Sequence, residues 1–149
     1  VNSWYNMLKC GTTITFEAWD NSFKPNQDWN HAWGSAPANA IPAGLMGIRP
    51  VEPGWKKVQI RPQTGDLDDG KVTVPTILGD VSLSFAKKAG SYSMEVDIPA
   101  NMEAEIVLPR ANRKSTLTVD GQTASIIRPG SLTKIETESG KHTITINEL

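Results

Sequence analysis

The feature that most constrains the fold is a long run of alternating segments that follows a proline- and glycine-rich stretch at residues 49–54. From Trp55 to Leu149, apolar or β-branched residues recur at every second position in short segments, and glycines fall between the segments. A period of two is typical of strands that bury one face, so the pattern favours a mainly β fold, an antiparallel β-sandwich of jelly-roll type. The expected strands lie within residues 55–62, 71–77, 80–88, 91–99, 104–110, 115–121, 132–139 and 142–149.

Before this run the pattern is helical. The first residues predict a helix of about two turns that Asn2 or Ser3 caps and Gly11 ends. A second helix is expected over residues 35–46, where Pro42 should kink or shorten it. Because so short a helix is unstable alone in water, its apolar face must pack against another part of the protein.

The stretch from Gly11 to Pro37 concentrates aromatic rings, carboxylates and a histidine. Within it, TTITFEAW alternates and predicts an extended segment with one apolar side. The other side combines a carboxylate, hydroxyls and an indole, which is the composition of a sugar pocket: flat rings stack on the sugar, and polar groups bind its hydroxyls. That polar side carries Thr13, Thr15, Glu17 and Trp19, and the apolar side carries Ile14, Phe16 and Ala18.

The runs GTTITFEAWD and KPNQDWNHAWGSAPA resemble the end of the catalytic domain of bacterial α-L-rhamnosidases, which are inverting glycoside hydrolases built on an (α/α)6 barrel. The resemblance continues through LMGIRPVEPGWKKVQIRPQTGDL into the β-rich part. It implies that residues 1–50 are the C-terminal piece of the helical-barrel catalytic domain and that residues 51–149 are a C-terminal β-sandwich domain. We therefore expect this chain to be the C-terminal part of a longer protein.

The resemblance also implies roles for individual residues. Glu17 takes the position of the general base, and the alternation agrees because it points Glu17 toward the side that carries the rings. His31 is expected to hydrogen-bond a sugar hydroxyl or to hold Glu17 in position, with a purely structural role as the alternative. Trp19 and Trp33 are expected to stack on the sugar or, alternatively, to fill the core. Asp20 is expected to be structural.

Inverting hydrolysis needs a carboxylic acid that protonates the leaving oxygen and a carboxylate about 6.5–9.5 Å away that deprotonates a water. By the resemblance, the acid would lie in the missing N-terminal part of the parent protein, so we expect the isolated chain to be inactive. Its substrate would be a rhamnose-containing glycoside or polysaccharide. An uncovered barrel segment would expose Trp4, Met7, Leu8 and Leu45, which predicts self-association of the fragment.

Two other functions fit the same residues. The chain could be a non-catalytic carbohydrate-binding or structural β-sandwich whose N-terminal aromatics form only a docking surface. It could also belong to an (α/α)6 glycosidase that acts on a different sugar, because these residues do not separate deoxy sugars from hexoses. Replacing Glu17 by Gln distinguishes the first alternative, since a binding site would lose at most one hydrogen bond.

Composition excludes several other classes. The net charge is −1, which gives no basic field for nucleic acid. No apolar run is long enough to cross a membrane. The single cysteine, Cys10, is expected to be a small buried thiol. We expect no metal and no cofactor for the chemistry, because two carboxylates suffice, although the resemblance does not exclude a calcium ion bound elsewhere. Asp66, Asp68 and Asp69 are expected to form a solvated turn rather than a calcium site. A periplasmic or secreted bacterial parent is suggested only by analogy.

Overall fold

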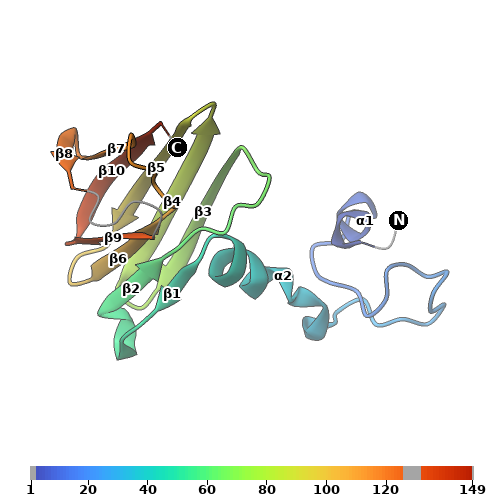
Figure 1. Ribbon diagram of the computed structural model, residues 1–149. Coiled ribbons are helices and arrows are strands. Elements are labelled where there is room, and N and C mark those ends of the chain that lie inside the picture. The colour runs from blue at the N-terminus through green and yellow to red at the C-terminus, as the bar shows by residue number, and fades with distance from the viewer. Residues whose placement is uncertain (1–2, 126–131, 149) are drawn as a thin grey trace. The chain divides into compact units, whose positions relative to one another are not determined.

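The computed structural model describes residues 3–125 and 132–148, which form two compact units, Val1–Ala40 and Ile41–Leu149 (Figure 1). Asn2 and Leu149 lie outside the described residues. All strands of the described part belong to the second unit. No helix in the described part is long and apolar enough to span a membrane.

The second unit consists of two sheets. One contains, in spatial order, β1 (Ile48–Pro50), β2 (Lys57–Ile60), β6 (Glu103–Leu108) and β9 (Thr133–Thr137). The other contains, in spatial order, β3 (Asp69–Thr76), β4 (Gly79–Lys88), β5 (Ser91–Ile98), β10 (Gly140–Asn147), β7 (Thr116–Val119) and β8 (Gln122–Ala124). A short 3-10 turn, η3 (Pro53–Trp55), joins β1 to β2.

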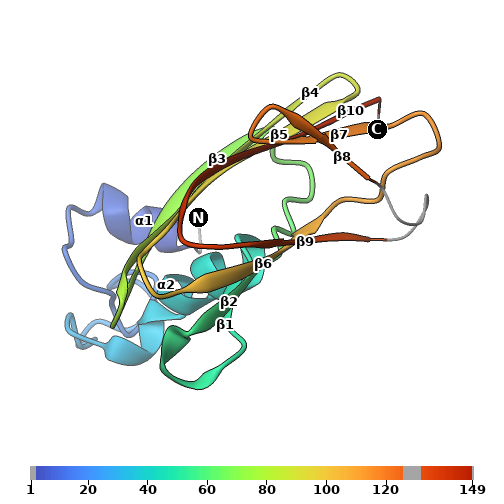
Figure 2. The same ribbon diagram turned by 90° about the vertical axis from the view of Figure 1, so that its left-hand side faces the viewer.

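The core lies between the two sheets, which Figure 2 shows as two layers. Alternate residues of the strands point into it, as the period of two predicts. Burying one such aliphatic side chain stabilises the fold by about 1.5–3 kcal/mol, so this layer is the main source of stability. Its least exposed members are Val58, Ile60, Ala104, Ile106 and Leu108 from the smaller sheet, and Val81, Leu83, Met94, Leu117, Ile144 and Ile146 from the larger one.

The mainly β fold predicted from the alternation is therefore confirmed, and each of the expected segments overlaps a strand. Two short strands, β1 and β8, were not expected. The sandwich is also not wholly antiparallel, because β2 pairs with β6 in parallel. This parallel pairing is possible because the chain crosses to the other sheet for β3, β4 and β5 before it returns, and such long crossovers are what parallel neighbours require.

The second unit begins at Ile41, earlier than the domain boundary expected at residue 50. The reason is that β1 pairs with β2 in an antiparallel register that starts at Ile48 and Ile60. Leu45 and Met46 also pack against the core of the sandwich. The assignment of residues 1–50 to a catalytic barrel is not tested by this division and stays a prediction.

The helices of the chain are short. Helix α1 (Trp4–Lys9) follows Ser3, whose side chain makes no capping hydrogen bond, and Gly11 adopts a φ of 75° after it. The second expected helix is divided into α2 (Pro37–Asn39) and the π-helical η2 (Ala40–Leu45), after the 3-10 turn η1 (Ala32–Ser35). Pro42 lies inside η2 and has no N–H to donate to an α-helical hydrogen bond. The helix is wider here: the Met46 N–H donates to the carbonyl of Ile41, five residues earlier, at 2.8 Å, as in a π-helix.

Candidate functional site

The residues predicted to carry chemistry lie in the first unit, where two segments of chain run beside each other. The Glu17 N–H donates to the Asp28 carbonyl at 2.9 Å, and the His31 N–H donates to the Thr15 carbonyl at 2.9 Å. The hydroxyl of Thr15 also donates to the His31 carbonyl at 2.6 Å. This pairing brings Glu17 and His31, which are distant in sequence, into one site.

The extended segment expected for TTITFEAW is wrong in detail, because the structure assigns bends rather than a strand to most of it. These residues form few backbone hydrogen bonds with a neighbouring segment, so they do not form a β-strand. The expected alternation survives at its centre, where Phe16 is buried and Glu17 is exposed. It fails at Ile14, which was placed on the apolar side and is 44% exposed.

The Glu17 carboxylate is held through both of its oxygens. Its Oε1 accepts a hydrogen bond from the ammonium of Lys24 at 2.5 Å, and its Oε2 accepts one from the Asp28 N–H at 3.1 Å. The side chain of Glu17 keeps 28% of its surface exposed. Glu17 is thus a fixed carboxylate that a water molecule can still reach.

The electrostatic environment favours the ionised form of this carboxylate. The hydrogen bond from Lys24 lowers the pKa of Glu17 below its usual value, and the Asp28 N–H and the charge of His31 act in the same direction. The backbone pairing of Thr15 with His31 and of Glu17 with Asp28 places His31 on the segment beside Glu17. At neutral pH Glu17 is therefore charged, which is the state that a proton acceptor needs.

The aromatic rings of the unit form pairs. Phe16 and Trp29 lie 5.0 Å apart between ring centroids, and Trp4 and Trp19 meet edge to face at 5.1 Å. Trp19 also holds helix α1 through its backbone, because the Asn6 amide donates to the Trp19 carbonyl at 3.0 Å. The structure thus engages Trp19, a predicted sugar platform, in packing against the first helix.

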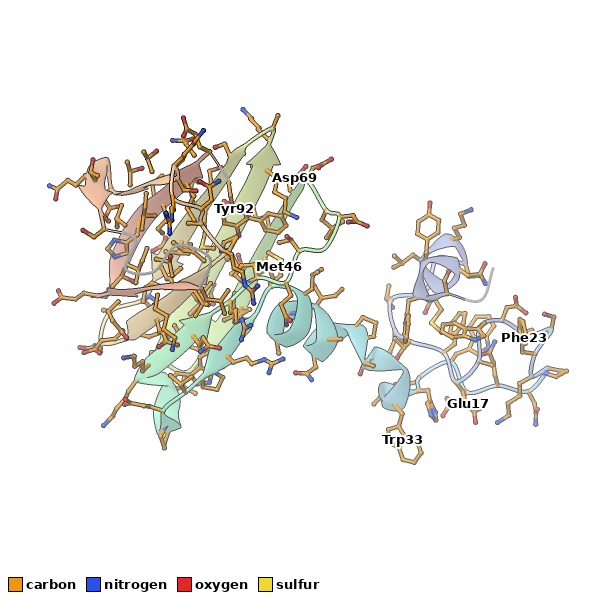
Figure 3. All side chains as sticks on the ribbon, in the orientation of Figure 1. Glu17, Phe23, Trp33, Met46, Asp69 and Tyr92 are labelled. Carbon is orange, nitrogen blue, oxygen red and sulfur yellow. The ribbon has the colours of Figure 1, made fainter. Side chains whose placement is uncertain are left out.

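Trp33 differs from the other rings because it is 89% exposed. Its ring meets that of His31 edge to face at 5.6 Å, and Figure 3 shows the side chain projecting away from the ribbon of this unit. So exposed a ring does not fill a core. The structure therefore pairs the rings of His31 and Trp33, whereas Trp19 packs against Trp4.

A pocket of about 260 Å³ lies in the same unit, but it is not formed by these residues. Cys10 lines it and is exposed, so the expectation of a buried thiol is wrong. The residues around it at the C-terminal end of α1, Leu8, Lys9 and Gly11, are exposed as well. Of the apolar residues expected to be uncovered, Trp4 and Leu8 are exposed, but Met7 is buried and Leu45 packs on the sandwich core. The predicted self-association stays a prediction. The pocket lining is completed by Phe16, Asp20, Asn21, Ser22, Gln27 and Trp29.

In the second unit several charged groups form ion pairs with other side chains. On the outer face of the smaller sheet, Lys57 pairs with Glu136 at 2.8 Å and Lys134 pairs with Glu105 at 2.8 Å. Among the described residues, no group of three or more His, Cys, Asp and Glu side chains could hold a metal ion.

Lys24 is the site residue that the sequence analysis missed. It occurs in Lys-Pro-Asn, a sequence that predicts a turn, and nothing in the spacing shows that its ammonium faces Glu17. A basic residue within a polar loop after a candidate catalytic carboxylate was the only available signal. Together, Glu17, Lys24, His31 and Trp33 can orient a water molecule, accept its proton and offer a flat ring to a ligand.

Comparisons of this sequence with known proteins agree on one family. The family described as "Bacterial alpha-L-rhamnosidase C-terminal domain" matches residues 47–123, slightly more than half of the chain. An α-L-rhamnosidase of Alteromonas sp. (strain LOR) is 31% identical over 117 residues, and one of Formosa agariphila is 30% identical over 140 residues. These matches cover 72% and 87% of this chain but only 12% and 14% of the relatives, so the chain spans a small part of their length.

Solved structures agree with the fold. The α-L-rhamnosidase of "Dictyoglumus thermophilum" superposes with a TM-score of 0.79 at 23% identity, over 95% of this chain and 17% of that chain. The Streptomyces avermitilis α-L-rhamnosidase, solved with L-rhamnose, superposes with a TM-score of 0.74 at 25% identity, over 97% of this chain and 15% of that one. The fold of both described units thus has counterparts within much larger proteins.

Proposed function

Because this chain belongs to the bacterial α-L-rhamnosidase C-terminal domain family, we propose that the complete protein removes terminal α-L-rhamnose from glycosides or polysaccharides with inversion, and that Glu17 is its general base. The chain would contribute the end of the catalytic barrel and the sandwich that follows it. The preceding part of the barrel would supply the general acid and the remaining sugar contacts.

The observation that carries this proposal is the state of the Glu17 carboxylate. It is ionised, is fixed by hydrogen bonds to both oxygens and remains partly exposed. In an inverting hydrolase such a group takes a proton from water while the water attacks the anomeric carbon from the face opposite the leaving oxygen. Each carboxylate oxygen has a second lone pair, so Glu17 can accept from that water and keep its present partners.

His31 and Trp33 would orient the sugar in this scheme. The imidazole lies close enough to act electrostatically on Glu17, and it is in contact with the Trp33 ring. A ring that is almost fully exposed offers a face to the apolar side of a deoxy sugar, while an imidazole hydrogen-bonds a hydroxyl. Trp19 would support the site through its contact with Trp4 rather than touch the sugar.

The experiment that tests the sugar and the stereochemistry is a product analysis by ¹H NMR. The complete protein is mixed with an aryl α-L-rhamnoside, and the anomeric signals are followed before mutarotation equilibrates them. Inversion predicts that β-L-rhamnose appears first. Initial α-L-rhamnose would exclude the inverting mechanism, and no hydrolysis would exclude the assigned sugar.

A further inference from the structure

We propose that Lys24 is a positioning residue for the catalytic base: its ammonium holds the Glu17 carboxylate in the ionised form and in one orientation. The proposal rests on the proposed function, in which Glu17 accepts the proton from water. Lys24 itself would touch neither the sugar nor the attacking water.

The geometry supports a positioning role because the two oxygens are held by groups from two different parts of the chain. The Lys24 ammonium binds Oε1, and the Asp28 N–H binds Oε2. A carboxylate bound at one oxygen still rotates about its terminal torsion, which is broad. Bonds to both oxygens fix the plane of the carboxylate and therefore the direction of its free lone pairs.

The loop that carries Lys24 is itself fixed. Gln27, which is only 7% exposed, accepts from the Ala18 N–H at 2.9 Å and donates to the Asn21 side chain at 2.9 Å. The Gln27 N–H donates to the Lys24 carbonyl at 3.1 Å, which closes the turn around Pro25. The buried amide thus anchors the loop immediately beside the Glu17 segment. The hydrogen-bonded backbone of this loop therefore holds Lys24 next to Glu17.

The charged groups that act on Glu17 in the described part of the chain are few. Lys24 is the strongest, and His31 adds a smaller favourable effect. The carboxylate of Asp28 accepts a hydrogen bond from the Asn30 N–H at 3.1 Å. Removing Lys24 would remove the largest of these effects, and the pKa of Glu17 would rise toward its usual value.

This arrangement has a cost and a benefit for catalysis. A carboxylate with a lowered pKa is a weaker proton acceptor, but it is fully ionised over a wider range of pH. The acidic limb of the pH profile of kcat/KM reports the pKa of the essential base in the free enzyme. Lys24 should therefore keep this limb at lower pH.

The test uses the complete protein and four variants: Lys24→Met, Lys24→Arg, Glu17→Gln and Lys9→Met. Lys24→Met removes the charge at similar length, and Lys24→Arg keeps it. Lys9→Met is the matched control, because Lys9 is an exposed lysine of the same unit that lies over Tyr5. The kcat/KM of an aryl α-L-rhamnoside is measured across the acidic limb, with circular dichroism to verify folding.

We expect Lys24→Met to move the acidic limb to higher pH, with kcat/KM on that limb falling about tenfold for each pH unit of movement. Lys24→Arg should restore the limb, and Lys9→Met should leave it in place. If Glu17→Gln loses turnover while Lys24→Met titrates like the unmodified protein, the role of Lys24 is wrong and the proposed base stands. If Glu17→Gln keeps turnover, the proposed base is wrong, and the role of Lys24 with it.

Discussion

Thr15 and His31 are joined by two hydrogen bonds, one from the His31 N–H to the Thr15 carbonyl at 2.9 Å and one from the Thr15 hydroxyl to the His31 carbonyl at 2.6 Å. Both bonds use only backbone atoms of His31. The backbone thus sets the position of the residue, and the imidazole takes no part in these two bonds. The role of the side chain can accordingly be separated from that of the fold.

His31→Ala should keep this pairing and lose only the imidazole. In the complete protein we expect kcat/KM for an aryl α-L-rhamnoside to fall about tenfold or more, because a hydrogen bond to the sugar and a favourable charge near Glu17 are both removed. Steady-state kinetics checks this, with Asn39→Ala as an exposed control in the same unit. Unchanged kinetics would assign His31 a structural role.

Trp33→Ala should weaken substrate binding without destabilising the protein. The ring is 89% exposed, so its loss removes almost no buried surface. Loss of a stacking contact predicts a rise in KM of about tenfold, or about 1.4 kcal/mol. Tyr5→Ala is the control, because that ring is also exposed, at 65%, and lies on helix α1. A large fall in thermal stability without a change in KM would contradict a binding role.

The alternation of the sequence predicted the sandwich well because one buried face per strand is a local pattern. The alternating burial of Ser91–Ile98 is an example that needs no knowledge of the partner strand. Strand β1 was missed because Ile48–Pro50 is short and enters a proline- and glycine-rich stretch. The parallel pairing of β2 with β6 was missed because it joins residues that are distant in sequence, and periodicity carries no information about such partners.

The candidate site was predictable only in part. The sequence indicated Glu17, His31 and Trp33, and the structure places them in one unit. It did not indicate Lys24, since the contact depends on the path of the loop that Gln27 anchors. Nor did it show that Trp19 packs against Trp4, because a choice between two rings at similar spacing depends on where helix α1 lies.

Gly47→Ala should strongly destabilise the sandwich. Gly47 has a φ of 69°, and an added Cβ would lie 1.9 Å from the backbone carbonyl oxygen of Arg61. Gly121 is the matched control, because it has a φ of 78° and no atom within 4 Å of such a Cβ. Urea unfolding should show a loss of about 1–2 kcal/mol for Gly121→Ala and clearly more for Gly47→Ala. Equal losses would mean that the contact with Arg61 relaxes freely.

Asp120→Asn should reduce the sensitivity of the sandwich to acid. The carboxylate contacts His142 Nδ1 at 2.8 Å and accepts from the Thr143 N–H at 2.7 Å. The bond with His142 is the main reason why the pKa of Asp120 lies below its usual value. A lowered folded-state pKa gives stability that is present above the unfolded value and is lost as pH falls through the folded one.

Thermal unfolding between about pH 5 and pH 2 tests this effect. The melting temperature of Asp120→Asn should fall less over that range than that of the unmodified protein. Asn tolerates the φ of 52° at this position, so the substitution adds little backbone strain. Parallel curves for the two proteins would show that the carboxylate of Asp120 contributes nothing that depends on pH.

The central claim is that Glu17 is the base, and the most direct measurement is the turnover of an aryl α-L-rhamnoside by the complete protein carrying Glu17→Ala, with and without azide. Glu52→Ala is the control, because Glu52 is an exposed glutamate of the other unit. We predict that Glu17→Ala lowers kcat by about 10²–10⁴ and that azide, which needs no base, restores turnover and gives the β-L-rhamnosyl azide. Turnover close to that of the unmodified protein in the absence of azide would contradict the account.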